Sequence, residues 1–196
     1  MDDLNAAGGL KPWTVKASRR VLDDKWLKVR ADTCETADGV EVSPYFVLEY
    51  PDWVHIVAID TEDHLILVEQ YRHGLGRICL ELPAGGIDPS DADPLAAGRR
   101  ELREETGYGA EAWRYVGKLS PNPANQGNFC HVVLATGATL QGATLDDPTE
   151  EIRVVRVPLD EAVRMALDGK LIQAMHVANL FLALSAAGRL KLSIAP

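Results

Sequence analysis

Short apolar runs separated by turn residues fill the first part of the chain and predict β-strands. Within residues 13–50 these runs are rich in valine, leucine and aromatic residues, and Asp38-Gly39 between two of them is a strong hairpin signal. Residues 53–59 and 65–68 form another apolar pair around a polar turn. This second pair predicts a further hairpin.

The rest of the chain mixes strand and helix signals. A strand is expected at 78–82, and the Pro- and Gly-rich residues 83–86 predict a loop after it. Asp93 is a good N-cap, Pro94 suits the first helical position and Gly107 supplies a stop, so a helix is expected between them. Apolar patterning predicts strands at 113–119, 130–135 and 152–157 and helices at 159–167 and 172–187. Without a regular βαβ alternation, this mixture predicts an α+β fold.

The chain divides by pattern into three parts. Residues 1–12 are expected to be a disordered leader, residues 13–50 a β-meander and residues 51–196 the main domain. A meander of this size buries little surface alone. We therefore expect it to pack on the rest of the chain or on another subunit.

Charge and composition narrow the classes of function. The formal net charge of −9 argues against a nucleic-acid partner, which usually binds a basic stripe. An acidic protein still binds phosphorylated substrates if cations neutralise its carboxylates, although many proteins are acidic for solubility alone. The three cysteines show no CxxC spacing. No signal peptide and no membrane-spanning run is visible, so a cytoplasmic location is expected.

The predicted helix before Gly107 carries a cluster of carboxylates. Glu101, Glu104 and Glu105 stand at i, i+3 and i+4 and so share one face, with Leu102 on the opposite side toward the core. Like charges side by side repel unless something positive lies among them. The face is either a solvated, salt-bridged surface or a site for a hard divalent cation.

The residues from Arg100 to Tyr108, preceded by Pro83 to Gly86, resemble the signature of the Nudix hydrolases, in which a glycine, five residues, a glutamate and seven residues precede REUxEExGU. The second half of that signature is complete here. Its first glutamate is missing. Counting back from the helix gives Gly86 and Ala92, whereas Gly85 as the first glycine gives Asp91 and one extra residue.

The resemblance implies a Nudix-type α/β/α sandwich of mixed sheets and a metal site. Mg²⁺, with Mn²⁺ as an alternative, is expected to bind the Ala84 carbonyl and the three helix carboxylates. Glu104 and Glu105 are then catalytic, and a glutamate on a later loop, Glu150 or Glu151, is expected to be the general base. If neither acts, Glu104 is the replacement candidate.

Further residues resemble the ADP-ribose and nucleoside-diphosphate-sugar pyrophosphatase branch. These are Glu69 to Arg72, Glu81 to Gly85, and Pro123, 16 residues after Gly107. Relatives with an N-terminal β-segment use it to form a homodimer, which is expected here as well. The residues expected to bind the nucleotide-sugar substrate are Arg72, Glu81, Trp53, Trp26 and Pro123.

The predicted function is metal-dependent cleavage of ADP-ribose or a related nucleoside-diphosphate sugar to a nucleoside monophosphate and a sugar phosphate. Two alternatives stay open. One is a nucleoside-triphosphate pyrophosphohydrolase, although such enzymes tend to lack the N-terminal meander. The other is a non-catalytic module that senses ADP-ribose, although such regulators generally lose signature carboxylates. Neither nucleic acid nor membrane is an expected partner.

Overall fold

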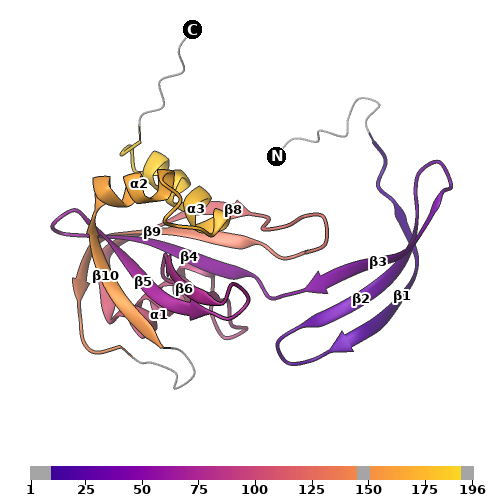
Figure 1. Cartoon of the computed structure of the whole chain (residues 1–196), viewed down its shortest axis with the longest axis horizontal. Helices are drawn as coiled ribbons and strands as arrows, with labels where there is room; N and C mark the ends of the chain where they lie inside the picture. Colours follow the sequence, from indigo (N-terminus) through magenta and orange to yellow (C-terminus); the bar gives the residue numbers. More distant parts are fainter. Residues whose placement is uncertain (1–9, 145–150, 191–196) are drawn as a thin grey trace, which may run out of the picture. The chain divides into compact units, whose positions relative to one another are not determined.

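A computed structural model describes residues 10–144 and 151–190 of the chain (Figure 1). These residues form two compact units. The smaller unit combines the N-terminal segment up to Tyr50 with Ser120–Asn128, and the larger unit contains the rest. The helix that carries the carboxylate cluster belongs to the larger unit.

The smaller unit is an antiparallel sheet in the order β1-β2-β3. Its strands are β1 (Thr14–Asp23), β2 (Lys28–Glu35) and β3 (Glu41–Glu49). Gly39 adopts φ +80° in the predicted turn between β2 and β3. Every residue of β1 is exposed, and several large apolar side chains of this sheet face solvent, among them Val15, Val21 and Phe46. The expected β-meander is present, with little core of its own.

The larger unit is built on a seven-stranded mixed sheet with the main order β10-β5-β4-β9-β8, with β6 paired to β5 and β7 paired to β4. β4 and β9 run parallel, whereas the other pairs are antiparallel. The strands are β4 (Trp53–Asp60), β5 (His64–Arg72), β6 (Arg77–Glu81), β7 (Ala84–Gly86), β8 (Tyr108–Leu119), β9 (Cys130–Leu140) and β10 (Ile152–Pro158).

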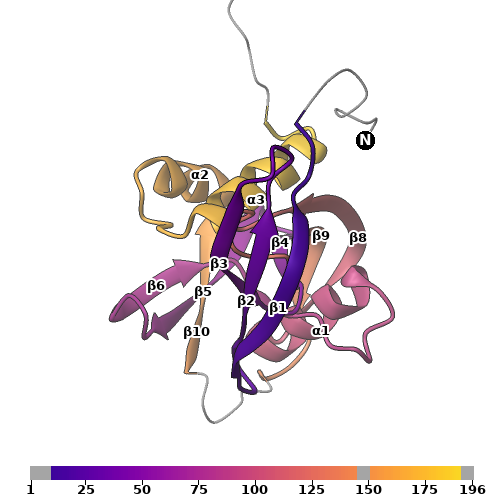
Figure 2. The same ribbon diagram turned by 90° about the vertical axis from the view of Figure 1, so that its right-hand side faces the viewer.

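Helices cover both faces of this sheet. α1 (Pro94–Thr106) lies on one face, whereas α2 (Leu159–Leu167) and α3 (Ala174–Ala186) lie on the other (Figures 1 and 2). β4 supplies both cores through its period of two. Val54, Ile56 and Ala58 pack in the cluster with α1, and Val57 and Ile59 pack in the cluster with α2 and α3. The predicted α+β sandwich of helices on mixed sheets is confirmed.

The caps of α1 follow the sequence signals. The Asp93 side chain accepts from the Ala96 N–H at 2.7 Å, and Gly107 ends the helix at φ +72°. A Cβ at Gly107 would lie 2.2 Å from the Gly142 carbonyl oxygen, so only glycine fits there. On the face toward the core, Leu102 is fully buried. The predicted helix is confirmed.

Several expected boundaries differ from the structure. β8 begins at Tyr108 rather than at 113 and β9 continues to Leu140 rather than ending at 135, because the two strands pair from Tyr108 and Leu140 onward. Residues Ala84–Gly86, expected to be loop, form the short strand β7, because they pair with Trp53 to His55 of β4. α3 begins at Ala174, two residues later than expected, because the Gln173 side chain caps it by accepting from the His176 N–H. None of the described helices has the length and apolar character needed to span a membrane.

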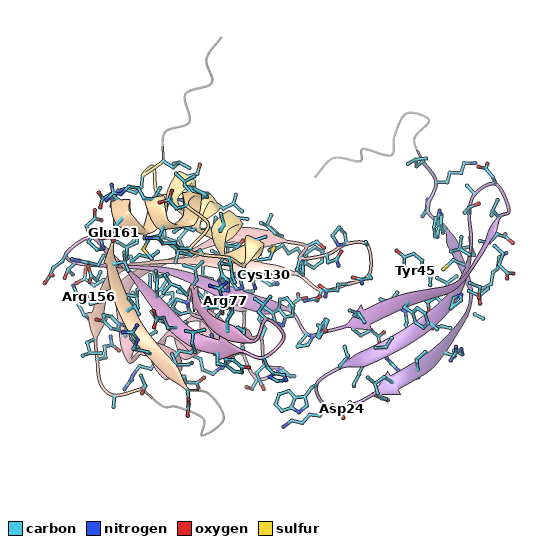
Figure 3. The ribbon with its side chains drawn as sticks, viewed as in Figure 1. Asp24, Tyr45, Arg77, Cys130, Arg156 and Glu161 are labelled. Atoms are coloured by element: carbon cyan, nitrogen blue, oxygen red, sulfur yellow. The ribbon has the colours of Figure 1, made fainter. Side chains whose placement is uncertain are left out.

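Side chains of the sheet and the helices form two buried apolar clusters, and Figure 3 draws the described side chains with Cys130 labelled. Cys130 on β9 is fully buried, and the Asn179 amide of α3 donates to its Sγ at 3.2 Å. Burial raises the pKa of the Cys130 thiol to about 12, despite the opposing hydrogen bond from Asn179. This cysteine is therefore a packing residue in its neutral form.

Candidate active site

The turn from β7 toward α1 is held directly by the carboxylates of α1. The Ala84 N–H donates to Glu105 Oε2 at 3.0 Å, and Glu105 is only 7% exposed. A Cβ on Gly85 would lie within 2.3 Å of the Glu101 carboxylate, which therefore rests against the backbone of β7. The sequence places the two elements in contact because Gly85 has no side chain to separate them.

Arg100 links the same carboxylates to the loop. Its Nη1 donates to Glu101 Oε1 at 2.8 Å and to Glu104 Oε2 at 3.0 Å. Its Nη2 donates to the Gly86 carbonyl and to Asp91 Oδ2, each at 2.9 Å. The hydrogen bond to Asp91 is the main reason why the pKa of Arg100 is raised, and it lowers the pKa of Asp91. Arg100 is thus a cation that donates hydrogen bonds to oxygens of four residues, namely Gly86, Asp91, Glu101 and Glu104.

These contacts decide which residues fill the altered positions of the signature. Gly85 is the glycine that needs to lack a Cβ, whereas nothing lies within 4 Å of a Cβ on Gly86. Asp91 forms the ion pair with Arg100, whereas Ala92 is exposed. The structure therefore supports Gly85 and Asp91, with one extra residue between Asp91 and the helix.

A second ion pair lies on the neighbouring strands β5 and β6. Arg72 directs Nε and Nη2 at the Glu81 carboxylate, with Nη2 at 2.5 Å from Oε2, and Gln70 donates to the same carboxylate at 3.3 Å. Burial raises the pKa of Glu81, but hydrogen bonds from His176 and Arg72 outweigh it and bring the pKa to about 2. Glu81 is therefore a fixed anion beneath Arg72.

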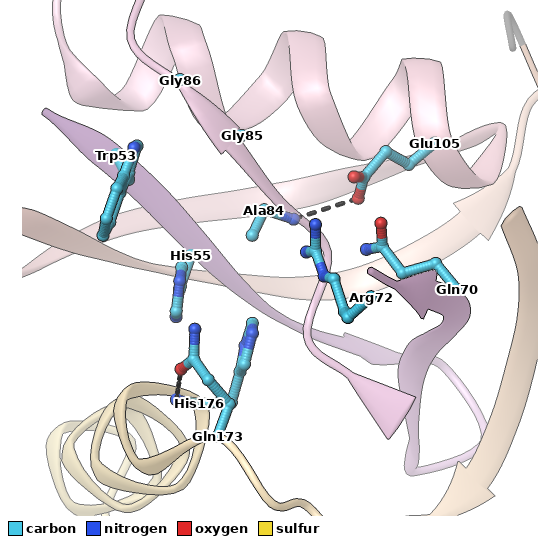
Figure 4. A pocket seen from close by; sticks show the side chains of 10 residues that line it. All are labelled: Trp53, His55, Gln70, Arg72, Ala84, Gly85, Gly86, Glu105, Gln173 and His176. Atoms are coloured by element: carbon cyan, nitrogen blue, oxygen red, sulfur yellow. Dashed lines mark hydrogen bonds between the residues drawn. The ribbon is translucent and has the colours of Figure 1, made fainter. Parts of the chain in front are cut away.

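The two groups of charges border one pocket of about 380 Å³ (Figure 4). Arg72 and Gln70 lie beside Glu105 and the β7 backbone, and Trp53 lies on another side of the pocket (Figure 4). The remaining lining residues are His55, Gly86, Gln173 and His176. The pocket combines a guanidinium, backbone amides and a helix carboxylate, which suits an anionic ligand together with a cation.

Comparison with known families assigns this arrangement. Residues 49–178 match the NUDIX domain. The chain belongs to the NUDIX family. Residues 13–48 match the nucleoside diphosphate sugar hydrolase N-terminal domain. The resemblance in the signature is confirmed, and the chain is a hydrolase of this family.

Individual NUDIX relatives and one solved structure are similar over most of the chain. The "Methanol dehydrogenase activator" of Bacillus methanolicus is 29% identical over 77% of this chain and 80% of its own length. The "ADP-ribose pyrophosphatase" of Mycobacterium tuberculosis is 34% identical over 68% of this chain and 65% of its own. A crystal structure of an "ADP compounds hydrolase" has a TM-score of 0.81 at 29% identity, covering 94% of this chain and all of the other.

Several predicted site residues of the NUDIX domain meet at the pocket, and others do not. Arg72, Trp53, Ala84 and Glu105 line it, and Glu81 is buried next to Arg72. Glu101 and Glu104 bind Arg100 on the loop side of α1.

The other predicted site residues lie elsewhere. Trp26, 77% exposed, and Pro123 belong to the smaller unit. Glu151 is exposed directly before β10. Glu150 lies outside the described residues. Of the candidates that the structure describes, Arg72, Trp53, Ala84 and Glu105 thus meet at one pocket, and Glu151 is not among its lining residues.

Two buried histidines at the pocket were missed by sequence reasoning. His55 and His176 line the pocket and stack face to face, with ring centroids 4.1 Å apart. Each is a polar residue inside an otherwise apolar stretch, which was the available signal. Their spacing of 121 positions hid the pair, since nothing local joins them.

The donor set of the NUDIX site fits a hard divalent cation in kind, because every candidate ligand is an oxygen. Two of these carboxylates already share one positive nitrogen of Arg100. Within residues 10–144 and 151–190, however, no three Cys, His, Asp or Glu side chains are grouped as a ready metal centre. Proteins of this family generally use a divalent metal ion. Because Arg100 Nη1 engages only Oε1 of Glu101 and Oε2 of Glu104, each of these carboxylates keeps its other oxygen to hold an ion.

Proposed function

We propose that the chain hydrolyses the diphosphate bond of ADP-ribose or a related nucleoside-diphosphate sugar, with Mg²⁺ as the ion. The observation that carries the proposal is that Arg72 and the Ala84–Glu105 contact border the same pocket. A diphosphate between them would have a permanent cation on one side and the carboxylate cluster on the other. The name of the M. tuberculosis relative and the N-terminal family match support this substrate class.

Each residue has a part in the proposed reaction. Arg72, oriented by Glu81, binds phosphate oxygens through its planar fork. Trp53 offers a flat face for the base or the sugar. The Ala84 carbonyl with Glu101, Glu104 and Glu105 would hold the metal.

When bound, Mg²⁺ would supply charge neutralisation and a lower pKa for the attacking water. Glu150 or Glu151 takes the proton from that water as its oxygen bonds to phosphorus, and the bond from phosphorus to the bridging oxygen breaks. The products are a nucleoside monophosphate and a sugar phosphate, which together carry the oxygen and protons of the water.

A substrate panel tests the proposal. The full chain is incubated with Mg²⁺ or Mn²⁺ and ADP-ribose, other nucleoside-diphosphate sugars or nucleoside triphosphates, and the products are separated by chromatography. AMP and ribose 5-phosphate from ADP-ribose are expected. Release of inorganic pyrophosphate from triphosphates, with no cleavage of sugar diphosphates, would instead establish the pyrophosphohydrolase alternative.

A second candidate is a non-catalytic module that senses ADP-ribose and acts on a partner. The name of the B. methanolicus relative, an activator of another enzyme, favours it. Calorimetry with ADP-ribose and Mg²⁺ separates the two. Binding of intact ADP-ribose that survives hours with the protein would support the module, whereas turnover supports the enzyme.

We also propose that two copies associate through residues 13–50. The exposed apolar side chains of this sheet support the proposal, since patches of this kind mark interaction surfaces. Trp26 and Pro123 belong to the same unit, and we expect them to contribute to substrate binding at a site that the two copies share.

A further inference from the structure

A cluster of buried polar side chains from α3 and β4 lies at the pocket, and Figure 4 shows its two histidines. It contains His176 and Asn179 from α3 and His55 from β4, which are 1%, 0% and 3% exposed. Burying polar groups this deeply is costly unless hydrogen bonds compensate for the lost water. The partners of the cluster therefore indicate what it holds in place.

His176 contacts the end of β6 through both ring nitrogens. The Leu82 N–H donates to His176 Nδ1 at 3.3 Å, so Nδ1 carries no proton. The proton of the neutral ring is then on Nε2, which lies 3.5 Å from Glu81 Oε2. One imidazole thus fixes a backbone amide and the carboxylate of the residue before it.

The ring of His176 is itself held in position. His55 stacks on it with an angle of 9° between the rings, and His55 Nδ1 lies 3.0 Å from the Asn179 amide nitrogen. Burial lowers the pKa of His55 far below its usual value, so the stacked neighbour stays neutral. Stacking and hydrogen bonds leave the imidazole of His176 little freedom to rotate.

The chain of contacts continues from His176 through Glu81 to Arg72, which lines the pocket. Glu81 Oε2 lies 3.5 Å from Nε2 of His176, and the carboxylate accepts from Gln70 and from the Nε and Nη2 edge of Arg72. Because a guanidinium is planar, an edge committed to Glu81 turns the remaining Nη1 edge away from it. Arg72 lines the pocket beside Glu105 (Figure 4). The orientation of Arg72 therefore depends on where Glu81 is held.

We infer that His176 is a positioning residue, which fixes Glu81 so that Arg72 presents its outer edge to the substrate diphosphate. The inference rests on the proposed function, because it gives Arg72 the diphosphate to bind. The competing explanation is a core histidine that only stabilises the fold. The two differ in whether Arg72 responds when His176 changes.

Two substitutions separate the roles of the ring. His176→Phe keeps a ring that stacks on His55 but removes both nitrogens. His176→Gln keeps one acceptor and one donor on the same side chain. Leu184→Val is the matched control, because Leu184 is buried on the same helix in the apolar core that contains Leu180 and Ala183. It loosens packing without touching Glu81.

Kinetics with ADP-ribose and Mg²⁺ are the first measurement. His176→Phe is expected to raise KM about tenfold and change kcat by less than about twofold, since Arg72 binds phosphate in ground state and transition state alike. His176→Gln is expected to recover most of that loss. In the Arg72→Lys background, His176→Phe should add almost nothing, because both changes act on one contact. Leu184→Val should lower the melting temperature and leave KM unchanged.

Nitrogen NMR of the full chain is the second measurement, and it needs no substrate. The wild-type His176 ring should show an unprotonated Nδ1 and a protonated Nε2. The Arg72 Nε–H signal, assigned by its loss in Arg72→Lys, should be sharp in wild type. It should broaden in His176→Phe and recover in His176→Gln.

The outcomes are distinct. A wild-type KM in His176→Phe, or a loss confined to kcat, overturns the inference, as does an additive loss with Arg72→Lys. If wild-type protein cleaves no compound of the panel, the proposed function fails. The Arg72 Nε–H signal alone then tests whether His176 positions Arg72. An Arg72 signal that is unchanged in His176→Phe overturns the positioning role in either case.

Discussion

Glu104 and Glu105 differ in environment although both belong to the carboxylate cluster of α1. The Glu104 side chain is 40% exposed and binds Arg100, whereas Glu105 is buried and accepts from Ala84. An amide in either place keeps an oxygen acceptor but loses the negative charge. A divalent cation is held much less tightly when one of its carboxylate ligands loses this charge.

Glu104→Gln and Glu105→Gln are therefore each expected to keep the fold and lower turnover by orders of magnitude. Steady-state rates at saturating Mg²⁺ and thermal unfolding measure the two effects. Glu161→Gln, an exposed glutamate on α2, is the control and should match wild type. Near wild-type turnover in both cluster variants would remove the metal assignment.

The general base is predicted in the acidic segment before β10. Glu151→Gln or Glu150→Gln is expected to lower kcat by about 10²–10⁴-fold with little change in KM, because a base acts mainly in the transition state. A change confined to KM would indicate a binding role. If the double variant slows turnover by less than tenfold, the base lies elsewhere, and Glu104 is the next candidate.

Glu81 gives the stability of the protein a defined dependence on pH. Its pKa is about 2 in the folded chain against 4.5 for the unperturbed group, so its ionised form stabilises the fold fully above pH 4.5. That contribution, on the order of 3 kcal/mol, is lost as the pH falls toward 2. Urea unfolding of wild type and Glu81→Gln should show a difference that shrinks over this range. A difference independent of pH would contradict it.

The placement of site residues could be predicted where those residues are close together in the sequence. Glu101, Glu104 and Glu105 are near neighbours on one helix, so their shared face follows from the helical period alone. The contact of His176 with Leu82 spans 94 positions and depends on how α3 packs on the sheet. No period or cap in the sequence encodes that packing.

At the scale of elements, β7 and α1 are in direct contact because Gly85 has no side chain between them. A Cβ at Gly85 would meet only the end of the Glu101 side chain, which is flexible. Gly85→Ala should therefore change the melting temperature little but displace the Glu101 carboxylate and lower turnover strongly. Gly86→Ala, with open space at its Cβ, is the matched comparison and should lose far less. Equal losses in both variants would show that the contact does not matter.

The elements themselves were largely predictable, for a physical reason. α1 carries an N-cap, a first-turn proline and a glycine stop, so local propensity and tertiary structure agree. β7 was not predicted, because three residues of Ala and Gly have no strand propensity of their own. They are extended only because they pair with the first three residues of β4. Tertiary pairing overrides local preference there.

At the scale of the whole molecule, the N-terminal sheet is expected to form a dimer with the same sheet of a second copy. Light scattering at micromolar concentration should give twice the 21.4 kDa of one chain. Val21→Asp, in the exposed face of β1, should shift the protein toward the monomer. Leu167→Asp, an exposed apolar residue of α2, should leave the mass unchanged. A monomeric wild type would refute the dimer.

The ion pair between Asp91 and Arg100 closes the segment that begins at Gly85 into a ring, which is completed where Glu101 rests on Gly85. Between Gly85 and Asp91, the number of residues is set by the distance that the backbone has to cover. Outside the ring, Ala92 lies between the closure and the N-cap Asp93, where an added residue disturbs neither. Counting back from Arg100 by the fixed spacing of the signature includes this extra residue, and the count then ends on Gly86 instead of Gly85. For chains of this kind, a signature is therefore better indexed from the salt bridge than from fixed spacing.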